Sequence, residues 1–263
     1  MMYMKTIEAI FLDMDGTVYS HTTNRIPPSA LRAVEAARKK GILVFVATGR
    51  NLWELRQMGI ADFPCDGWIT MNGSYCFNDQ GVYYKNPIDS GDIAVLIEEL
   101  EKTPFPVIFC EGDDMFINYA DEEMKKSLEA IHTGLAEPRD IHNAVQREIF
   151  QLIPYAREGV WRHVEERLSH VKCIRWTELA VDVCPADSGK DIGVRKTCEY
   201  YGIDLSRTLA AGDGPNDMDL FRACAFKAAM GNGAELLKRE ADFISDDIDQ
   251  DGLYRIVEEY GCL

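Results

Sequence analysis

The feature of this sequence that most restricts its fold is a set of short apolar runs that each end abruptly in small or acidic residues. Ile7 to Leu12 is apolar apart from one glutamate and ends in Asp13-Met14-Asp15. Ile42 to Ala47 is continuously apolar and ends in Thr48-Gly49-Arg50. Apolar runs of this length are typical of parallel strands that are covered on both faces. The sequence therefore predicts a parallel sheet with polar side chains at its strand ends.

Segments with helical character separate these runs. "PPSALRAVEAARKKG" starts with two prolines and stops at a glycine, which are the residues that favour helix entry and exit. Later, helical "GKDIGVRKTCEYYG" precedes the apolar "RTLAAGD", and helical "NDMDLFRACA" precedes "FKAAMG". Strands that alternate with helices are typical of the α/β class, with a doubly wound, Rossmann-like parallel sheet.

The middle of the chain has a different character. "PVIFCEGDDMFINYA", "EIFQLIPY", "VKCIRW" and "LAVDVC" predict strands, and helices are expected at Ile93 to Leu100 and Glu122 to Ile131. This α+β mixture interrupts the alternating pattern. We therefore expect a core domain made of residues 1–81 and 186–263, with an α+β domain of residues 82–185 inserted into it.

Composition restricts the partners of the chain. The 263 residues include 44 acidic and 28 basic side chains, for a formal net charge of −16. Nucleic acid and anionic membranes need clustered Lys and Arg, so we expect neither as a partner. The N-terminus has no small-residue cleavage site, and the eight cysteines form no CxxC pair, which favours reduced thiols in a cytoplasmic protein. We expect a monomer or a homodimer.

Polar residues follow three of the predicted strands. In an open parallel sheet, ligands bind beyond the carboxyl ends of the strands. If the three strands are neighbours, one place collects Asp13, Asp15, Thr48, Asp213, Asn216 and Asp217. Four carboxylates in one place need a cation, and oxygen ligands favour Mg²⁺, with Mn²⁺ or Ca²⁺ as alternatives.

The same place offers groups for a phosphate ester. Thr48 and the backbone amides of Gly49 and Arg50 form an anion cradle at a helix start, and Lys190 adds a positive charge. A carboxylate such as Asp13 can accept a phosphoryl group, which water then removes. Asp15 is close enough to act as general acid and base. The Arg50 side chain either contacts the substrate or pairs with an acid.

Taken together, "DMDGT", "ATGR", Lys190 and "GDGPND" resemble the four motifs of the haloacid dehalogenase (HAD) superfamily, in the order that this family uses. The insert between the second and third motifs, and "MNG" at Met71 to Gly73, resemble its Cof-type (IIB) branch, which has a large α/β cap. The resemblance implies a Mg²⁺-dependent phosphatase that acts on a small phosphorylated metabolite, with sugar phosphates favoured.

The resemblance also implies individual roles. Asp13 would be the nucleophile and Asp15 the general acid and base, while Asp217 would orient Lys190 or a metal-bound water. Mg²⁺ would be held by Asp13, Asp213 and the backbone carbonyl of Asp15. The expected phosphate contacts come from the amide of Met14 and from Thr48, Gly49, Lys190 and Asn216.

Two other kinds of ligand-binding loop do not match this sequence. An EF-hand starting at Asp13 fails because Val18 and Asn24 stand where a glycine and a glutamate are required. A Walker loop fails because Cys184 and Asp191 replace its glycine and its hydroxyl residue. A phosphomutase or phosphotransferase would share every core residue. A non-catalytic metabolite-binding module on the same fold would not need both Asp13 and Asp15.

Overall fold

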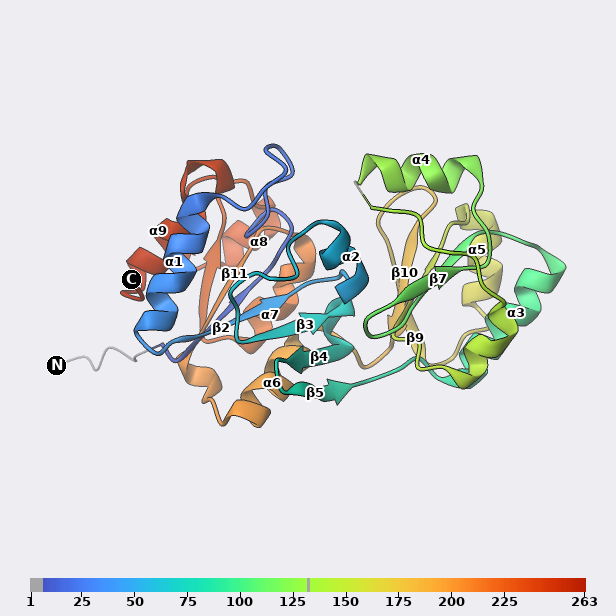
Figure 1. Cartoon of the computed structure of the whole chain (residues 1–263), viewed down its shortest axis with the longest axis horizontal. Coiled ribbons are helices and arrows are strands. Elements are labelled where there is room, and N and C mark those ends of the chain that lie inside the picture. Colours follow the sequence, from blue (N-terminus) through green and yellow to red (C-terminus); the bar gives the residue numbers. More distant parts are fainter. Residues whose placement is uncertain (1–6, 132) are drawn as a thin grey trace. The chain divides into compact units, whose positions relative to one another are not determined.

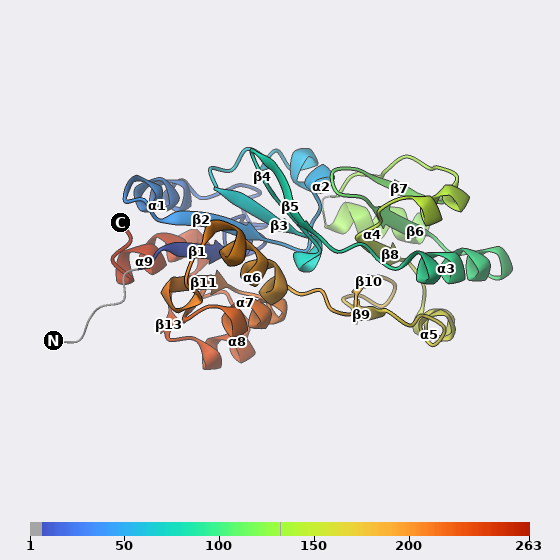
Figure 2. The same ribbon diagram turned by 90° about the horizontal axis from the view of Figure 1, so that it is seen from below.

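The computed structural model describes residues 7–131 and 133–263 (Figures 1 and 2). By its internal contacts the chain divides into two compact units. The first contains Met1–Gly49, Phe63–Tyr84 and Gly189–Leu263, and the second contains Arg50–Asp62 and Lys85–Ser188. In the described part of the chain, no helix combines the length and the apolar character needed to cross a membrane.

A sheet of eight described strands forms the centre of the first unit. Its order is β13 (Phe243–Ile244), β12 (Phe226–Ala229), β11 (Thr208–Gly212), β1 (Ala9–Leu12), β2 (Leu43–Ala47), β3 (Gly67–Thr70), β4 (Tyr75–Asn78) and β5 (Gly81–Lys85). The strands from β13 to β3 are parallel, whereas β4 runs antiparallel to β3. Strands β2, β1 and β11 are neighbours, so their carboxyl ends lie at one edge of the sheet.

Helices cover both faces of this sheet. On one face, Phe11, Phe45 and Ile69 pack with apolar side chains of α6 (Lys190–Tyr201), α7 (Met218–Ala223) and α8 (Glu235–Glu240). Helix α1 (Pro28–Lys39) packs against α9 (Gly252–Glu259) and β2, away from those three helices (Figures 1 and 2). Short 3₁₀ turns complete the unit: η1 (Met71–Gly73), η3 (Leu205–Arg207), η4 (Pro215–Asp217) and η5 (Ile248–Gln250).

The second unit contains an antiparallel sheet. Its order is β7 (Met115–Ile117), β6 (Val107–Cys110), β8 (Gln151–Pro154), β10 (Val181–Pro185) and β9 (Val171–Arg175). Phe109, Leu152 and Val183 pack with Leu96 and Trp161 of its helices in one apolar cluster. These elements are α2 (Leu52–Gln57), α3 (Ser90–Lys102), α4 (Glu122–Ala130), α5 (Glu158–Glu165) and the 3₁₀ turn η2 (Ile141–Gln146).

The fold class predicted from the sequence is confirmed: the chain is α/β, with a doubly wound parallel sheet and an inserted α+β part. The parallel strands lie where the apolar runs predicted them, because a strand covered on both faces is apolar along its whole length. Strands β4 and β5 and helix α5 were not predicted. Each buries few residues: Cys76 alone in β4, none in β5, and Trp161 and Val164 in α5. Such short spans offer too few buried positions to show a periodicity.

Candidate active site

Strand β1 delivers Asp13 to the edge where the parallel strands end. All four residues of the strand are buried, and the backbone N–H of Asp13 donates to the carbonyl of Ala211 at 2.9 Å. This bond continues the pairing of β1 with β11 by one residue. The Asp13 side chain therefore has a rigid mount, and only 5% of the residue is exposed.

Lys190, the first residue of α6, joins two acids at this edge. Its Nζ donates to Oδ1 of Asp13 at 2.6 Å and to Oδ1 of Asp217 at 2.7 Å. Lys190 is 1% exposed, although it is a side chain that water normally solvates. A buried ammonium with two carboxylate partners has a fixed position, so Lys190 holds Asp13 in place.

The acids of the cluster are short of positive charge. Burial raises the pKa of Asp13 well above its ordinary value, and the Asp217 carboxylate raises it further, although Lys190 opposes both. Burial also raises the pKa of Asp213 to about 6, with a contribution from Asp217, against a hydrogen bond from Thr17. Burial lowers the pKa of Lys190, but Asp13 and Asp217 outweigh that effect and raise it above its usual value. Lys190 is therefore a cation, and the cluster still favours a further positive charge.

A divalent cation fits this cluster. One carboxylate oxygen from each of Asp13, Asp213 and Asp217 lies within 4.8 Å of the others. Asp217 has other partners: Oδ2 accepts the backbone N–H groups of Asp213 and Gly214, both at 2.9 Å, and Oδ1 accepts from Lys190. Asp13 and Asp213 are thus the better candidate ligands, and hard oxygen donors suit Mg²⁺.

The turn after β1 leaves room for Asp213. Gly16 has a φ of +86°, and a methyl group in place of its hydrogen would lie 2.3 Å from Oδ2 of Asp213. The hydroxyl of Thr17 donates to the other oxygen, Oδ1, at 3.0 Å. Glycine at this position is therefore required both by the backbone conformation and by the close approach of the carboxylate.

A second turn, η1 (Met71–Gly73), contacts both the end of β2 and the residue before α6. The backbone N–H of Asn72 donates to the carbonyl of Thr48 at 3.0 Å, and its side chain lies beside Gly49. Met71, Asn72 and Gly73 have φ values of +49°, +52° and +89°. A methyl group on Gly73 would lie 1.9 Å from the carbonyl oxygen of Gly189. This strained turn brings the "ATGR" segment close to the residue before Lys190, and such strain is often found at functional sites.

The remaining residues expected at the site lie in different places. Met14 and Thr48 are buried beside the strand ends, and Asp15 is half-buried. Asn216 is exposed in η4, between Asp213 and Asp217 in sequence.

Arg50 belongs to the second unit. Its guanidinium donates to the Thr133 hydroxyl at 3.4 Å, and the same nitrogen lies 3.8 Å from a carboxylate oxygen of Glu54.

Two contacts at the site were not predicted. The side-chain amide of Asn232 donates to the carbonyl of Gly16 at 2.8 Å, and its oxygen accepts from the backbone N–H of Ile248 at 2.9 Å. The Nε2 of His21 lies 2.8 Å from Oδ1 of Asp15. Sequence offers little signal for either, because both contacts depend on how loops return to the turn after β1.

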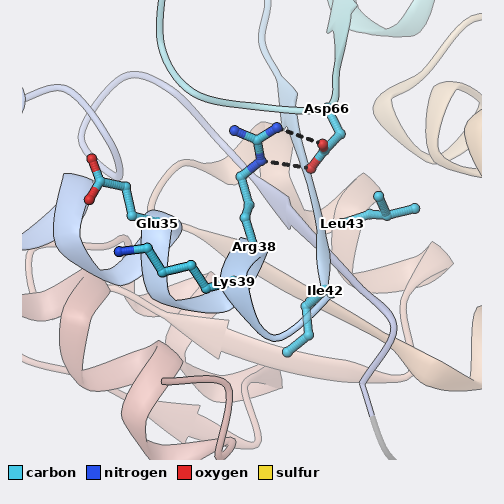
Figure 3. A pocket seen from close by; sticks show the side chains of 7 residues that line it. Glu35, Arg38, Lys39, Ile42, Leu43 and Asp66 are labelled. Carbon is cyan, nitrogen blue, oxygen red and sulfur yellow. Dashed lines mark hydrogen bonds and ion pairs between the residues drawn. The ribbon is translucent and has the colours of Figure 1, made fainter.

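A hollow of about 400 Å³ at the other end of the sheet has a different character (Figure 3). Its lining includes Ile42 and Leu43, where β2 begins. Arg38 donates to both oxygens of Asp66, at 2.8 and 3.2 Å, and Asp66 also accepts from the backbone N–H of Val44. Because Arg38, Asp66 and the Val44 N–H bond to one another, they have a structural role, and we assign no ligand to this hollow.

Comparison with known proteins gives a consistent result. The model of the haloacid dehalogenase-like hydrolase family matches residues 10–257. The putative phosphatase YkrA of Bacillus subtilis is 32% identical, over 97% of this chain and 98% of its own.

Solved structures are similar over the whole chain. The subclass IIB sugar phosphatase BT4131 is 33% identical, with a TM-score of 0.81 over 97% of this chain and 100% of its own. The HAD phosphatase BT1666 of Bacteroides thetaiotaomicron is 29% identical, with a TM-score of 0.88 over 100% and 98% of the two chains. This chain belongs to the haloacid dehalogenase-like hydrolase family, in the Cof-type (IIB) branch, and is a phosphatase.

Proposed function

We propose that this phosphatase is a Mg²⁺-dependent phosphomonoester hydrolase that works through an aspartyl-phosphate intermediate. The observation that carries the proposal is the ion pair of the buried Lys190 with both Asp13 and Asp217, next to Asp213. Lys190 keeps a carboxylate oxygen of Asp13 in a fixed position at the end of a rigid strand. A nucleophile needs such an orientation to attack in line.

Separate groups of residues would bind the metal ion and the phosphate. Mg²⁺ would be held by the carboxylates of Asp13 and Asp213 and by the backbone carbonyl of Asp15. When bound, it would neutralise charge on the phosphate and on the acids around it. The phosphate oxygens would be held by the amide of Met14 and by Thr48, Gly49, Lys190 and Asn216, while Arg50 is proposed as a substrate contact.

The chemistry would proceed in two displacements. In the first, a carboxylate oxygen of Asp13 forms a bond to phosphorus while the bond to the leaving oxygen breaks, and Asp15 gives that oxygen its proton. In the second, Asp15 takes a proton from water, whose oxygen attacks phosphorus and releases Asp13 and inorganic phosphate. Asp217 keeps Lys190 aligned in both steps through the contact at 2.7 Å.

The substrate class is proposed to be a small phosphorylated metabolite, with sugar phosphates first. BT4131, a sugar phosphatase by its description, is similar to this chain over nearly all of both chains. All eight cysteines are free, which fits a reducing compartment, and we propose a cytoplasmic location.

A panel of phosphate esters tests this function. The native protein is expected to release inorganic phosphate from sugar phosphates when Mg²⁺ is present, and EDTA should stop the reaction. Asp13→Asn keeps the shape of the side chain but removes the nucleophile, so it should be inactive. Phosphate release by Asp13→Asn would refute the mechanism, and a bisphosphorylated product would indicate a phosphotransferase instead.

A further inference from the structure

His21 makes a contact with Asp15 to which the proposed reaction assigns no role. Its Nε2 lies 2.8 Å from Oδ1 of Asp15, the residue proposed to carry the proton. The two residues are six positions apart, and the contact exists because the loop after β1 folds back on itself. His21 therefore reaches the proton carrier from a segment that lies outside the four family motifs.

The loop that carries His21 is well ordered by backbone bonds. The N–H of Gly16 donates to the carbonyl of Tyr19 at 2.9 Å, and the N–H of Tyr19 donates to the carbonyl of Met14 at 2.8 Å. Ser20 and Arg25 exchange two backbone hydrogen bonds, at 2.9 and 3.2 Å. This small hairpin fixes the Cα of His21 relative to the turn that carries Asp15.

The ring of His21 also has a packing partner. It meets the ring of Tyr19 edge to face, with centroids 5.3 Å apart and an interplanar angle of 78°. Tyr19 is buried, so it forms a fixed surface against which the imidazole packs. The contact with the Tyr19 ring and the contact with the Asp15 oxygen together define the orientation of the imidazole.

Stability is a poor explanation for this pair. The side chains of His21 and Asp15 are 43% and 30% exposed, and exposed pairs contribute little to folding free energy. Orientation is a better one, because a proton carrier must keep one geometry relative to the leaving oxygen. A second anchor on the Asp15 carboxyl supplies that geometry.

We propose that His21 is a positioning residue for proton transfer by Asp15, an inference that rests on the proposed function. In this role the Nε2–H of His21 donates to Oδ1 of Asp15. In the first step the Asp15 proton moves to the leaving oxygen as the bond from that oxygen to phosphorus breaks, and His21 keeps its own proton. The hydrogen bond becomes charge-assisted as Asp15 turns into a carboxylate, so it favours the transfer.

Two phenyl esters of similar shape provide the test. Phenyl phosphate has a leaving group that needs a proton, whereas the nitrophenolate of 4-nitrophenyl phosphate leaves without one. The ratio kcat/KM reports events up to the first irreversible step, which includes departure of this group. His21→Phe keeps a ring against Tyr19 but removes the donor. It should lower kcat/KM by about tenfold for phenyl phosphate and by less than about twofold for 4-nitrophenyl phosphate.

Three further variants make the result specific. His21→Gln offers an amide N–H of similar reach and should recover most of the loss with phenyl phosphate. Asp15→Asn should show the same preference for the nitrophenyl ester, to a larger degree. Thr23→Val alters a residue of the same loop that contacts Asp249 and should leave both esters unchanged.

The outcomes separate this inference from the proposed function. If Asp13→Asn still hydrolyses either ester, or the native protein hydrolyses neither these esters nor any sugar phosphate of the panel, the proposed function fails. If Asp13→Asn is inactive but His21→Phe slows both esters equally, or neither, only the role of His21 is refuted. The leaving-group preference together with recovery in His21→Gln would establish it, since general damage to the loop would not depend on the leaving group.

Discussion

Charge balance at the candidate active site depends on single residues. Three carboxylates, from Asp13, Asp213 and Asp217, gather around one ammonium, that of Lys190. If all are ionised, the cluster carries two excess negative charges, which equals the charge that one divalent cation neutralises. Without a metal, burial and the neighbouring acids raise the pKa of Asp13 and of Asp213, so protons can relieve the same excess charge.

Replacing Lys190 tests this balance. Lys190→Met should abolish activity and lower the free energy of unfolding by about 3–5 kcal/mol at neutral pH, because it leaves buried carboxylates without their cation. Lys196→Met alters an exposed lysine of the same helix, paired with Glu199 at 3.0 Å, and should cost about 0.5 kcal/mol or less. Urea unfolding measures both, and equal values would show that Lys190 does not neutralise the acids.

Gly16 also affects the site, because its lack of a side chain leaves room for the Asp213 carboxylate. Gly16→Ala places a methyl group against Asp213, so it should weaken Mg²⁺ binding and reduce activity. Gly41→Ala is a matched control, because Gly41 has a similar φ of +79° and open space around it. Both variants pay about 1–2 kcal/mol for the left-handed backbone. A Mg²⁺ titration followed by activity should therefore separate them, and equal Mg²⁺ affinities would argue against Asp213 as a ligand.

At the scale of elements, α2 is a short helix whose start is unusually well anchored. Asn51 accepts from the backbone N–H of Glu54, and Glu54 accepts from the backbone N–H of Asn51, both at 2.9 Å. The side-chain amide of Asn51 also donates to the carbonyl of Asp114, at the turn between β6 and β7. A single buried side chain thus both caps the helix and ties it to the sheet of the second unit.

Removing this cap should lower the free energy of unfolding by more than removing an ordinary helix cap. Asn51→Ala loses the capping bond and the contact with Asp114, and should lower the free energy of unfolding by about 2 kcal/mol. Asp121→Ala is the matched control, since the exposed Asp121 caps α4 by accepting from the backbone N–H of Met124, and its loss should cost about 1 kcal/mol. Equal losses in urea unfolding would show that the Asp114 contact is unimportant.

Element type was predictable from sequence where burial is uniform. β1 and β2 are buried on both faces, so continuous apolar runs identified them, and parallel strand ends then indicated where Asp13 and Asp213 would meet. The site was harder to predict where the path of a loop determines which side chains meet. Lys190 alone is indistinguishable from a solvated helix lysine, and His21 reaches Asp15 only because the loop after β1 closes into a hairpin. Such returns depend on backbone geometry that residue patterns do not encode.

For the whole molecule, the carboxylate cluster of the candidate metal site couples folding to pH. In the metal-free protein the pKa of Asp213 is raised to about 6 and that of Asp13 is raised as well, so both exceed the values of an unfolded chain. A carboxyl group of this kind contributes stability that is present below its unfolded pKa, near 4, and is lost as pH rises through the folded pKa. The metal-free protein should therefore lose stability between about pH 4 and 6 through Asp213, and the raised pKa of Asp13 adds a loss of the same sign.

Mg²⁺ should reverse this loss, because it takes the place of the protons. The increase in Tm on adding 10 mM MgCl₂ should be larger at pH 7.5 than at pH 5, where the proton on Asp213 competes with the cation. A ligand at about ten times its Kd stabilises the folded state by about 1.4 kcal/mol, which a thermal scan resolves. Asp213→Asn should remove most of the increase at pH 7.5. An increase that is the same at both pH values, or that survives in Asp213→Asn, would place the cation away from this cluster.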